Sequence, residues 1–177
     1  DFARVEIPQY QQRLLSVTPY GVALSDLNRH DLEYKAGADV FWKPNGDHQF
    51  ALAVNPDFGQ VESDQLVVNF SATETQFTDK RPFFTENQGY FNLQHNLGQL
   101  FYTRRVGGPA DDGNGTSDIR LALKAIGSAG DFGYGAFAAS EAGEGGSDFV
   151  LLRGTYGDES LLGGATVSHV DRPFLDR

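Results

Sequence analysis

Apolar and polar residues alternate along residues 32–43, and this alternation limits the possible folds more than any other feature of the chain. The even-numbered positions carry Leu, Tyr, Ala, Ala, Val and Trp, whereas the odd-numbered positions are polar or small except for Phe41. A helix would spread the charged side chains around its circumference, but a β-strand places the two kinds of residue on opposite faces. The pattern therefore predicts a strand.

The same pattern recurs along the chain, with turn residues between the repeats. Asn45-Gly46 favours a tight hairpin turn, so we expect residues 48–55 to return beside the first strand. Further strands are expected over residues 118–126, 132–142, 149–157 and 161–170. These segments predict an all-β antiparallel meander in which consecutive strands are neighbours.

The length of the strands indicates a particular kind of all-β protein. They span about 9–12 residues, whereas an average globular strand has about 5–6. A strand of about 10 residues, tilted near 45°, covers about 23 Å, which is close to the apolar band of an outer-membrane barrel. We therefore expect a meander of long strands that is part of an outer-membrane β-barrel.

Composition excludes several classes of function. The 24 acidic and 14 basic residues give a net charge of −10, so we expect no nucleic acid partner. The absence of Cys removes disulfides, thiolate zinc sites and cysteine nucleophiles. We expect no cofactor, no metal and no catalytic residues. The chain also lacks Met, and we take it as a fragment of a longer chain.

Residues 1–177 are expected to form a single barrel segment with four parts. Residues 56–106 mix short apolar runs with dense charge and lack long alternation, so bent strands with an inserted loop are expected there. Such a segment is costly to expose to lipid, and we expect a plug-like or rim element. The other parts are the first strands and hairpin (1–55), a loop (107–117) and further hairpins (118–177).

Three stretches of the irregular segment carry a family resemblance. They read NPDFGQVESD over 55–64, DKRPFFTEN over 79–87 and LFYTRRVG over 100–107. In this order they resemble the barrel region of uncharacterised bacterial outer-membrane proteins, a domain of unknown function that follows a domain similar to a family-nine carbohydrate-binding module. The resemblance implies a Gram-negative outer membrane and a barrel larger than this chain, and it brings no catalytic residues.

Charged residues of the irregular segment are the candidate site. They could form a network in the lumen that contacts a glycan or an anionic small molecule, or they could pair with one another to hold the inserted loop. Phe83 and Phe84 are expected to anchor the apolar side of this segment. The lumen or ligand-contact candidates are Glu62, Glu74, Arg81, Glu86, Arg104 and Arg105.

Alternation also predicts which side chains contact lipid and which face the lumen. A charge at the centre of a bilayer is costly, so the apolar face of each strand should contact lipid. The residues expected on the lipid face are Tyr34, Val40, Trp42, Phe50, Leu52 and Leu121. Those expected on the lumen face are Glu33, Lys35, Asp39, Arg120 and Lys124.

The expected function is non-enzymatic: transport, envelope architecture or glycan handling in the outer membrane, with membrane lipid as a partner. One alternative is a soluble all-β domain, a sandwich or jelly roll, that binds carbohydrate. A second is a glycoside hydrolase that uses carboxylates such as Asp57 and Glu62. Oxygen side chains at nearly alternate positions over 111–118 suit either a calcium loop or a solvated turn.

Overall fold

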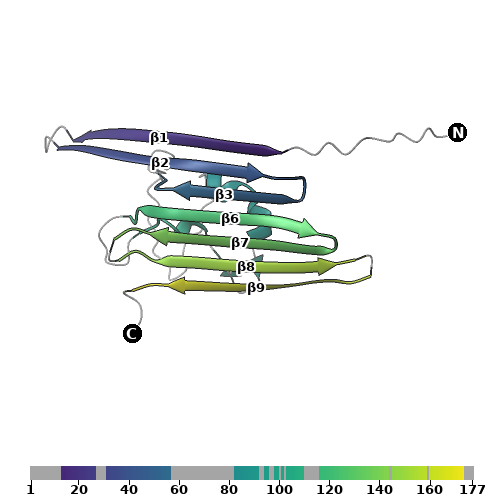
Figure 1. Cartoon of the computed structure of the whole chain (residues 1–177). Coiled ribbons are helices and arrows are strands. Elements are labelled where there is room, and N and C mark those ends of the chain that lie inside the picture. The colour runs from purple at the N-terminus through teal and green to yellow at the C-terminus, as the bar shows by residue number, and fades with distance from the viewer. Residues whose placement is uncertain are drawn as a thin grey trace.

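The computed structural model describes residues 13–26, 31–56, 82–91, 94–95, 98–99, 101, 103–109, 116–143, 145–158 and 160–173. The long strands are β1 (Leu14–Asp26), β2 (Asp31–Lys43), β3 (His48–Val54), β6 (Ile119–Ala129), β7 (Phe132–Glu141), β8 (Asp148–Gly157) and β9 (Leu162–Asp171). They form one seven-stranded antiparallel sheet in the order β1-β2-β3-β6-β7-β8-β9 (Figure 1). Shorter elements between β3 and β6 are α1 (Pro82–Thr85), α2 (Gln88–Phe91), β4 (Gln94–His95), β5 (Gly98–Gln99) and a 3-10 turn, η1 (Thr103–Arg105).

The predicted hairpins are confirmed, and most strand boundaries agree closely with the predicted ranges. The strand that differs most from its predicted range is β6, because the sequence pattern predicted a turn from Gly127 onward. The small residues there still pair with β7, as far as Ala129 opposite Phe132. The chain reverses only at Gly130, whose φ of 60° suits a residue without a side chain. The turn is therefore fixed by one glycine.

The described strands do not close into a barrel. β1 and β9 form the two edges of the sheet, and no described strand pairs with the outer side of either edge. The predicted all-β antiparallel meander is confirmed, because consecutive long strands are neighbours in one sheet.

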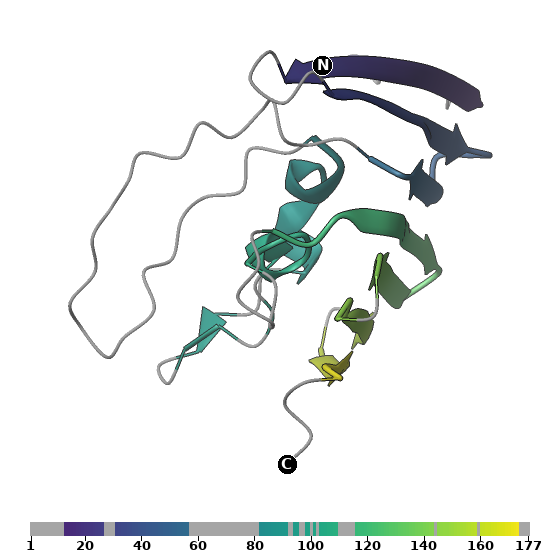
Figure 2. The same ribbon diagram turned by 90° about the vertical axis from the view of Figure 1, so that its left-hand side faces the viewer.

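The sheet is curved, and its cross-strand register separates two faces (Figure 2). The face on the concave side carries α1 and α2, and we call it the inner face. One row of cross-strand neighbours on it is Phe41, Ala51, Lys124, Phe137 and Leu151. The opposite side is the outer face, and the adjacent row there is Val40, Leu52, Leu123, Ala138 and Val150.

The hydrophobic core lies between the inner face and the described residues of 82–107, which we call the covering segment. Phe137 of β7 is its centre, with the ring centroids of Phe83, Phe84, Phe91 and Phe101 at 6.4, 5.9, 6.3 and 5.0 Å. The expectation that Phe83 and Phe84 anchor this segment is confirmed. In the described part of this segment the strands are limited to β4 and β5, and short helices turn their rings toward the sheet. Residues 57–81, where bent strands were also expected, lie outside the described residues.

Candidate functional site

The outer face presents a continuous apolar surface. Its large side chains follow every second position of the strands and are substantially exposed, with Tyr34 at 73% and Leu152 at 52%. The cross-strand register places all six residues predicted for the lipid face on this face, which confirms that they belong together. Further exposed members are Leu15, Val17, Val54, Leu123, Val150 and Val167.

Aromatic residues gather at one end of the outer face. Trp42 and Phe50 stack with ring centroids 5.2 Å apart, next to the turn between β2 and β3. The Tyr134 hydroxyl lies 3.0 Å from His48 Nδ1, above Gly127. A Cβ at Gly127 would lie 2.4 Å from that His48 nitrogen, so the contact requires glycine.

Charged side chains point to the inner face, as the alternation predicted. On β2, Asp39 is opposite Ala53 of β3, and Lys35 shares its face because the two positions are separated by an even number. Lys35 Nζ lies 3.2 Å from Asp118 Oδ1. The side chain of Glu33 lies outside the described residues.

Arg120 departs from the predicted alternation. The register of β6 against β7 shifts between Ile119 and Leu121, so one residue is inserted at this point. Ile119 is buried in the core, whereas Arg120 is exposed and its Nη2 donates to Ser140 Oγ at 2.9 Å. Ser140 pairs with Leu121 of the outer face, and the β-bulge therefore turns Arg120 away from the predicted lumen side.

Lys124 fastens the covering segment to the sheet. This lysine is only 3% exposed, and its Nζ donates to the backbone oxygens of Phe83 at 2.5 Å and Glu86 at 2.6 Å. The ammonium also lies 5.0 Å from the centroid of the Phe83 ring. Carbonyls at the end of a short helix have no partner within the helix, and Lys124 supplies one.

A second anchor lies at α2. Tyr90 packs on the inner face where Gly135 leaves room, because a Cβ there would lie 2.4 Å from the tyrosine ring. Arg153 of β8 stacks over this ring at 5.2 Å and donates to the Tyr90 backbone oxygen at 3.0 Å. The Tyr90 hydroxyl reaches Thr155 Oγ1 at 3.3 Å.

A buried carboxylate holds the far end of the covering segment. Glu141, at the end of β7, accepts a hydrogen bond from the backbone nitrogen of Gly107 at 2.8 Å. Its other oxygen accepts from the backbone nitrogen of Ser147 at 3.0 Å. The carboxylate therefore links the covering segment to the connection between β7 and β8.

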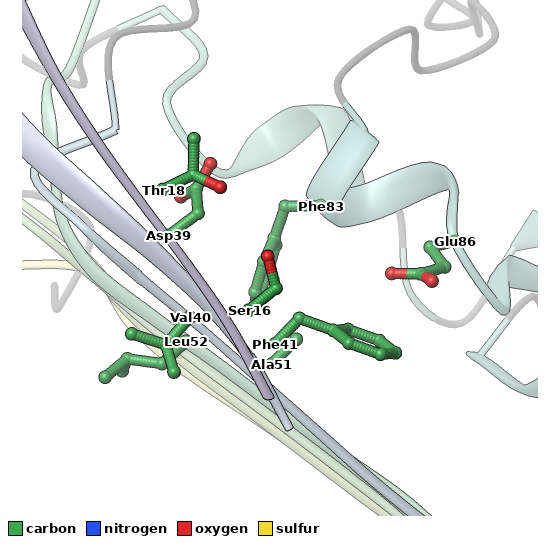
Figure 3. A pocket seen from close by; sticks show the side chains of 9 residues that line it. All are labelled: Ser16, Thr18, Asp39, Val40, Phe41, Ala51, Leu52, Phe83 and Glu86. Carbon is green, nitrogen blue, oxygen red and sulfur yellow. The ribbon is translucent and has the colours of Figure 1, made fainter. Parts of the chain in front are cut away.

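A cleft of about 440 Å³ opens between α1 and the first three strands (Figure 3). Its polar lining consists of Ser16 and Thr18 from β1, Asp39 from β2, and Glu86 just after α1. Figure 3 shows the side chains of Val40 and Leu52 on the opposite side of the strands, so the remaining side chains that face the cleft are Phe41, Ala51 and Phe83.

One oxygen in this cleft lacks a hydrogen-bond partner. Asp39 Oδ1 is fully buried and has no donor among the described residues. Buried polar atoms are normally paired, and an unpaired carboxylate oxygen costs free energy. Gln49 Nε2, on the neighbouring strand β3, is likewise buried without a partner among the described residues.

The structure describes half of the predicted site residues at least in part. Glu86 lines the cleft, and Arg105 is exposed on η1. Arg104 lies on η1 with its side chain outside the described residues. The candidates that lie wholly outside the described residues are Glu62, Glu74 and Arg81.

Sequence reasoning missed the contributions of β1 to the cleft. Ser16 and Thr18 stand at alternate positions of a strand whose range was not predicted, because Pro19 and Gly21 obscure its pattern. The only available signal was the spacing of the two hydroxyl residues. The functions of Arg153 and Glu141 were also missed, since their partners lie far away in the sequence.

The fold and site define a class: an antiparallel all-β sheet with an exposed apolar face and a covered, charged inner face. A family model described as Domain of unknown function (DUF5916) matches residues 12–122, more than half of the chain, and the chain belongs to this family. The predicted membership in a domain of unknown function is thereby confirmed. No curated protein and no solved structure matches the chain. No helix in the described residues is long and apolar enough to cross a membrane.

Proposed function

We propose that this chain is a non-enzymatic segment of a bacterial outer-membrane β-barrel whose outer face contacts lipid. The observation that carries the proposal is the exposed apolar outer face, which extends from Leu15 on β1 to Val167 on β9. Soluble proteins rarely expose an apolar surface that covers a whole sheet. Acyl chains would remove this surface from water without the need for a second protein layer.

The dimensions of the strands support a membrane position. The shortest strands of the second half, β7, β8 and β9, each have 10 residues, and β1 and β2 have 13. About 10 residues at roughly 3.3 Å, tilted near 45°, match the apolar band of about 25 Å in outer-membrane barrels. Six of the seven strands of the sheet are therefore close to the length that this band needs, whereas β3 has only 7 residues.

The distribution of turns and aromatic residues supports the same position. The connections over 44–47, 130–131 and 158–161 are short and lie at one end of the sheet (Figure 1). The exposed rings of Trp42, Phe132 and Tyr156 lie at this end. Outer-membrane barrels combine short turns on one side with aromatic girdles at the membrane interfaces.

In this proposal the inner face lines an aqueous interior that the covering segment narrows. The anchors at Lys124, Arg153 and Glu141 hold that segment against the sheet. β1 and β9 are edges of the described sheet, and further strands would pair with them to complete a larger barrel. A narrowed interior fits transport, whereas a filled one fits envelope architecture.

The single tryptophan of the chain allows a direct test of lipid contact. In lipid vesicles, lipids brominated along their acyl chains should strongly quench Trp42 fluorescence, because the side chain lies on the outer face. Aqueous acrylamide should quench it weakly. A matched control moves the reporter to the inner face by combining Trp42→Phe with Ser168→Trp, since Ser168 pairs with the inner-face residue Leu151. In this variant acrylamide should be the stronger quencher.

The alternative of a soluble carbohydrate-binding domain predicts the opposite quenching of Trp42. It needs a second layer over the outer face, and the described residues leave that face exposed. A monodisperse protein in detergent-free buffer, with Trp42 shielded from acrylamide and unaffected by brominated lipid, would overturn the membrane proposal.

A further inference from the structure

We propose that the cleft between β1, β2 and α1 binds a small organic cation, an extended alkyl diamine with one ammonium at Asp39 and the other at Glu86. This inference goes beyond the proposed membrane function and does not depend on it, because the cleft lies on the inner face. Its residues come from the sheet and from the covering segment, which together enclose about 440 Å³. Ligand sites commonly have volumes of about 300–1,000 Å³.

The charge of the cleft favours a cation. Asp39 and Glu86 contribute two carboxylates, and none of the described residues that line the cleft is basic. Lys124 is buried on the same face of the sheet, and its ammonium donates to the backbone oxygens of Phe83 and Glu86. Among the described residues, the lining of the cleft therefore carries two carboxylates and no cation, which favours a cation over an anion as the ligand.

The buried oxygen of Asp39 points to a ligand that donates hydrogen bonds. Asp39 Oδ1 lacks a donor among the described residues, although its carboxylate lies in the lining of a cleft. An ammonium offers three N–H donors and a positive charge, whereas a carboxylate offers acceptors only. An amine bound here would supply the missing hydrogen bond as a charge-assisted one.

The other lining groups complete an amine site. Thr18, opposite Asp39, and Ser16, opposite Phe41, add hydroxyl oxygens to the lining that can accept further N–H donors. Phe41 and Phe83 add aromatic surface, which attracts cations and covers the methylene groups of an alkyl chain. Ala51 forms part of the sheet surface beneath, and its small side chain leaves the volume open. In the view of Figure 3, Phe83 lies between Asp39 and Glu86, which suits an extended diamine.

Titration calorimetry of the full-length protein in detergent, with 1,4-diaminobutane as the probe, tests this site. The neutral isostere 1,4-butanediol separates charge recognition from simple filling of the cleft. We expect the diamine to bind and the diol not to bind. Asp39→Asn should weaken diamine binding about tenfold or more, since a hydrogen bond to a charged group contributes about 1.5–3 kcal/mol. Glu86→Gln should weaken it less, because Glu86 is exposed.

The matched control is Asp131→Asn. Asp131 lies exposed in the turn between β6 and β7, so Asp131→Asn removes one negative charge, as Asp39→Asn does, without touching the cleft. Diamine affinity should remain unchanged in this variant. Asn is nearly isosteric with Asp, and the β-sheet circular dichroism of all three variants verifies their folding. The separate Glu86 variant tests the site from a different element.

Three outcomes would overturn the proposal. Equal binding of the diol and the diamine would show that charge is not recognised. Equal weakening by Asp131→Asn and Asp39→Asn would show diffuse attraction to an acidic protein. Binding of a neutral sugar such as methyl glucoside, without diamine binding, would assign the cleft to carbohydrate. None of these results depends on whether Trp42 contacts lipid, so the two proposals fail separately.

Discussion

Lys124 shows how a single charged residue can anchor a covering segment to a sheet face that otherwise carries small and aromatic side chains. Its position on β6 places it on the inner face between Ala51 and Phe137, where burial of an ammonium is costly without partners. Its two hydrogen-bond acceptors among the described residues are backbone oxygens of the covering segment. The alternation predicted the direction of Lys124 correctly. Its partners could not be predicted, because they lie 41 and 38 residues away in the sequence.

Removal of the ammonium should loosen the covering segment and leave the sheet intact. Lys124→Met keeps the length and the apolar stem of the side chain, but two buried carbonyls lose their donor. We expect docking of residues 82–91 to weaken by about 1–3 kcal/mol. Hydrogen exchange measures this as faster exchange of the amides of α1 and α2. Lys43→Met, at the end of β2, is the matched control and should leave these amides protected. Equal protection in both variants would contradict the role assigned to Lys124.

Two turns of the sheet are stabilised in the same way, by a side-chain oxygen that accepts hydrogen bonds from backbone nitrogens. Asn45 Oδ1 accepts from the backbone nitrogens of Asp47 and His48 at 3.0 and 2.9 Å. Asp158 Oδ1 accepts from those of Ser160 and Leu161, both at 2.7 Å. Such side-chain acceptors replace missing backbone partners in a turn. The sequence predicted the first turn from its Asn-Gly pair, and it placed the second from the polar run between two strands.

The turn between β8 and β9 should depend on pH in the acid range. Hydrogen bonds from Ser160 and Leu161 hold the pKa of Asp158 below its ordinary value of 3.8. A carboxyl with a lowered folded-state pKa stabilises the fold fully above its unfolded value, and this contribution is lost as the pH falls through the folded value. We therefore expect exchange of the Leu161 amide to accelerate below about pH 4.

Asp158→Asn is the control for this titration. The amide side chain keeps an oxygen acceptor but has no proton to gain in this range, so Leu161 exchange should lose its additional acid dependence. The same acid acceleration in the variant and in the native chain would assign the effect to a different group.

β1 and the short helices could not be predicted from local sequence patterns. β1 pairs with β2 without interruption from Leu14 opposite Lys43 to Asp26 opposite Asp31. Its sequence does not alternate cleanly, and Pro19 interrupts no backbone hydrogen bonding elsewhere in the described sheet because β1 is at its edge. The neighbouring strand therefore determines β1 more than its own residues do. The short helices of the covering segment were missed for a related reason: the aromatic residues of α1 and α2 pack on Phe137, which lies far along the chain.

At the scale of the whole molecule, two faces of opposite character meet in one sheet. Strand alternation was sufficient to predict this separation, because neighbouring strands remain in register and every second residue keeps its side. The bulge at Arg120 is the local exception. The cleft could not be predicted, because it forms only where β1, β2 and the covering segment meet.

The two faces should respond differently to one added charge. β9 offers a matched pair, because Val167 is exposed on the outer face opposite Leu152 and Ser168 is exposed on the inner face opposite Leu151. Gly37 on β2 is unsuitable as the inner-face position of such a pair. Any side chain there would clash, because a Cβ would lie 2.5 Å from the backbone oxygens of Val54 and Asn55. If lipid covers the outer face, Val167→Arg should destabilise the inserted protein by about 2–4 kcal/mol, the cost of a lipid-facing arginine near the bilayer midplane.

Ser168→Arg should have little effect, because its guanidinium would face the aqueous interior. Urea unfolding of the full-length protein from lipid vesicles measures both variants against the native chain. The comparison controls for strand, depth and residue type, since the two positions are adjacent and receive the same side chain. Equal destabilisation, or a larger effect of Ser168→Arg, would place water on the outer face. An asymmetric loss at Val167 alone would follow from a sheet whose apolar face is solvated by lipid.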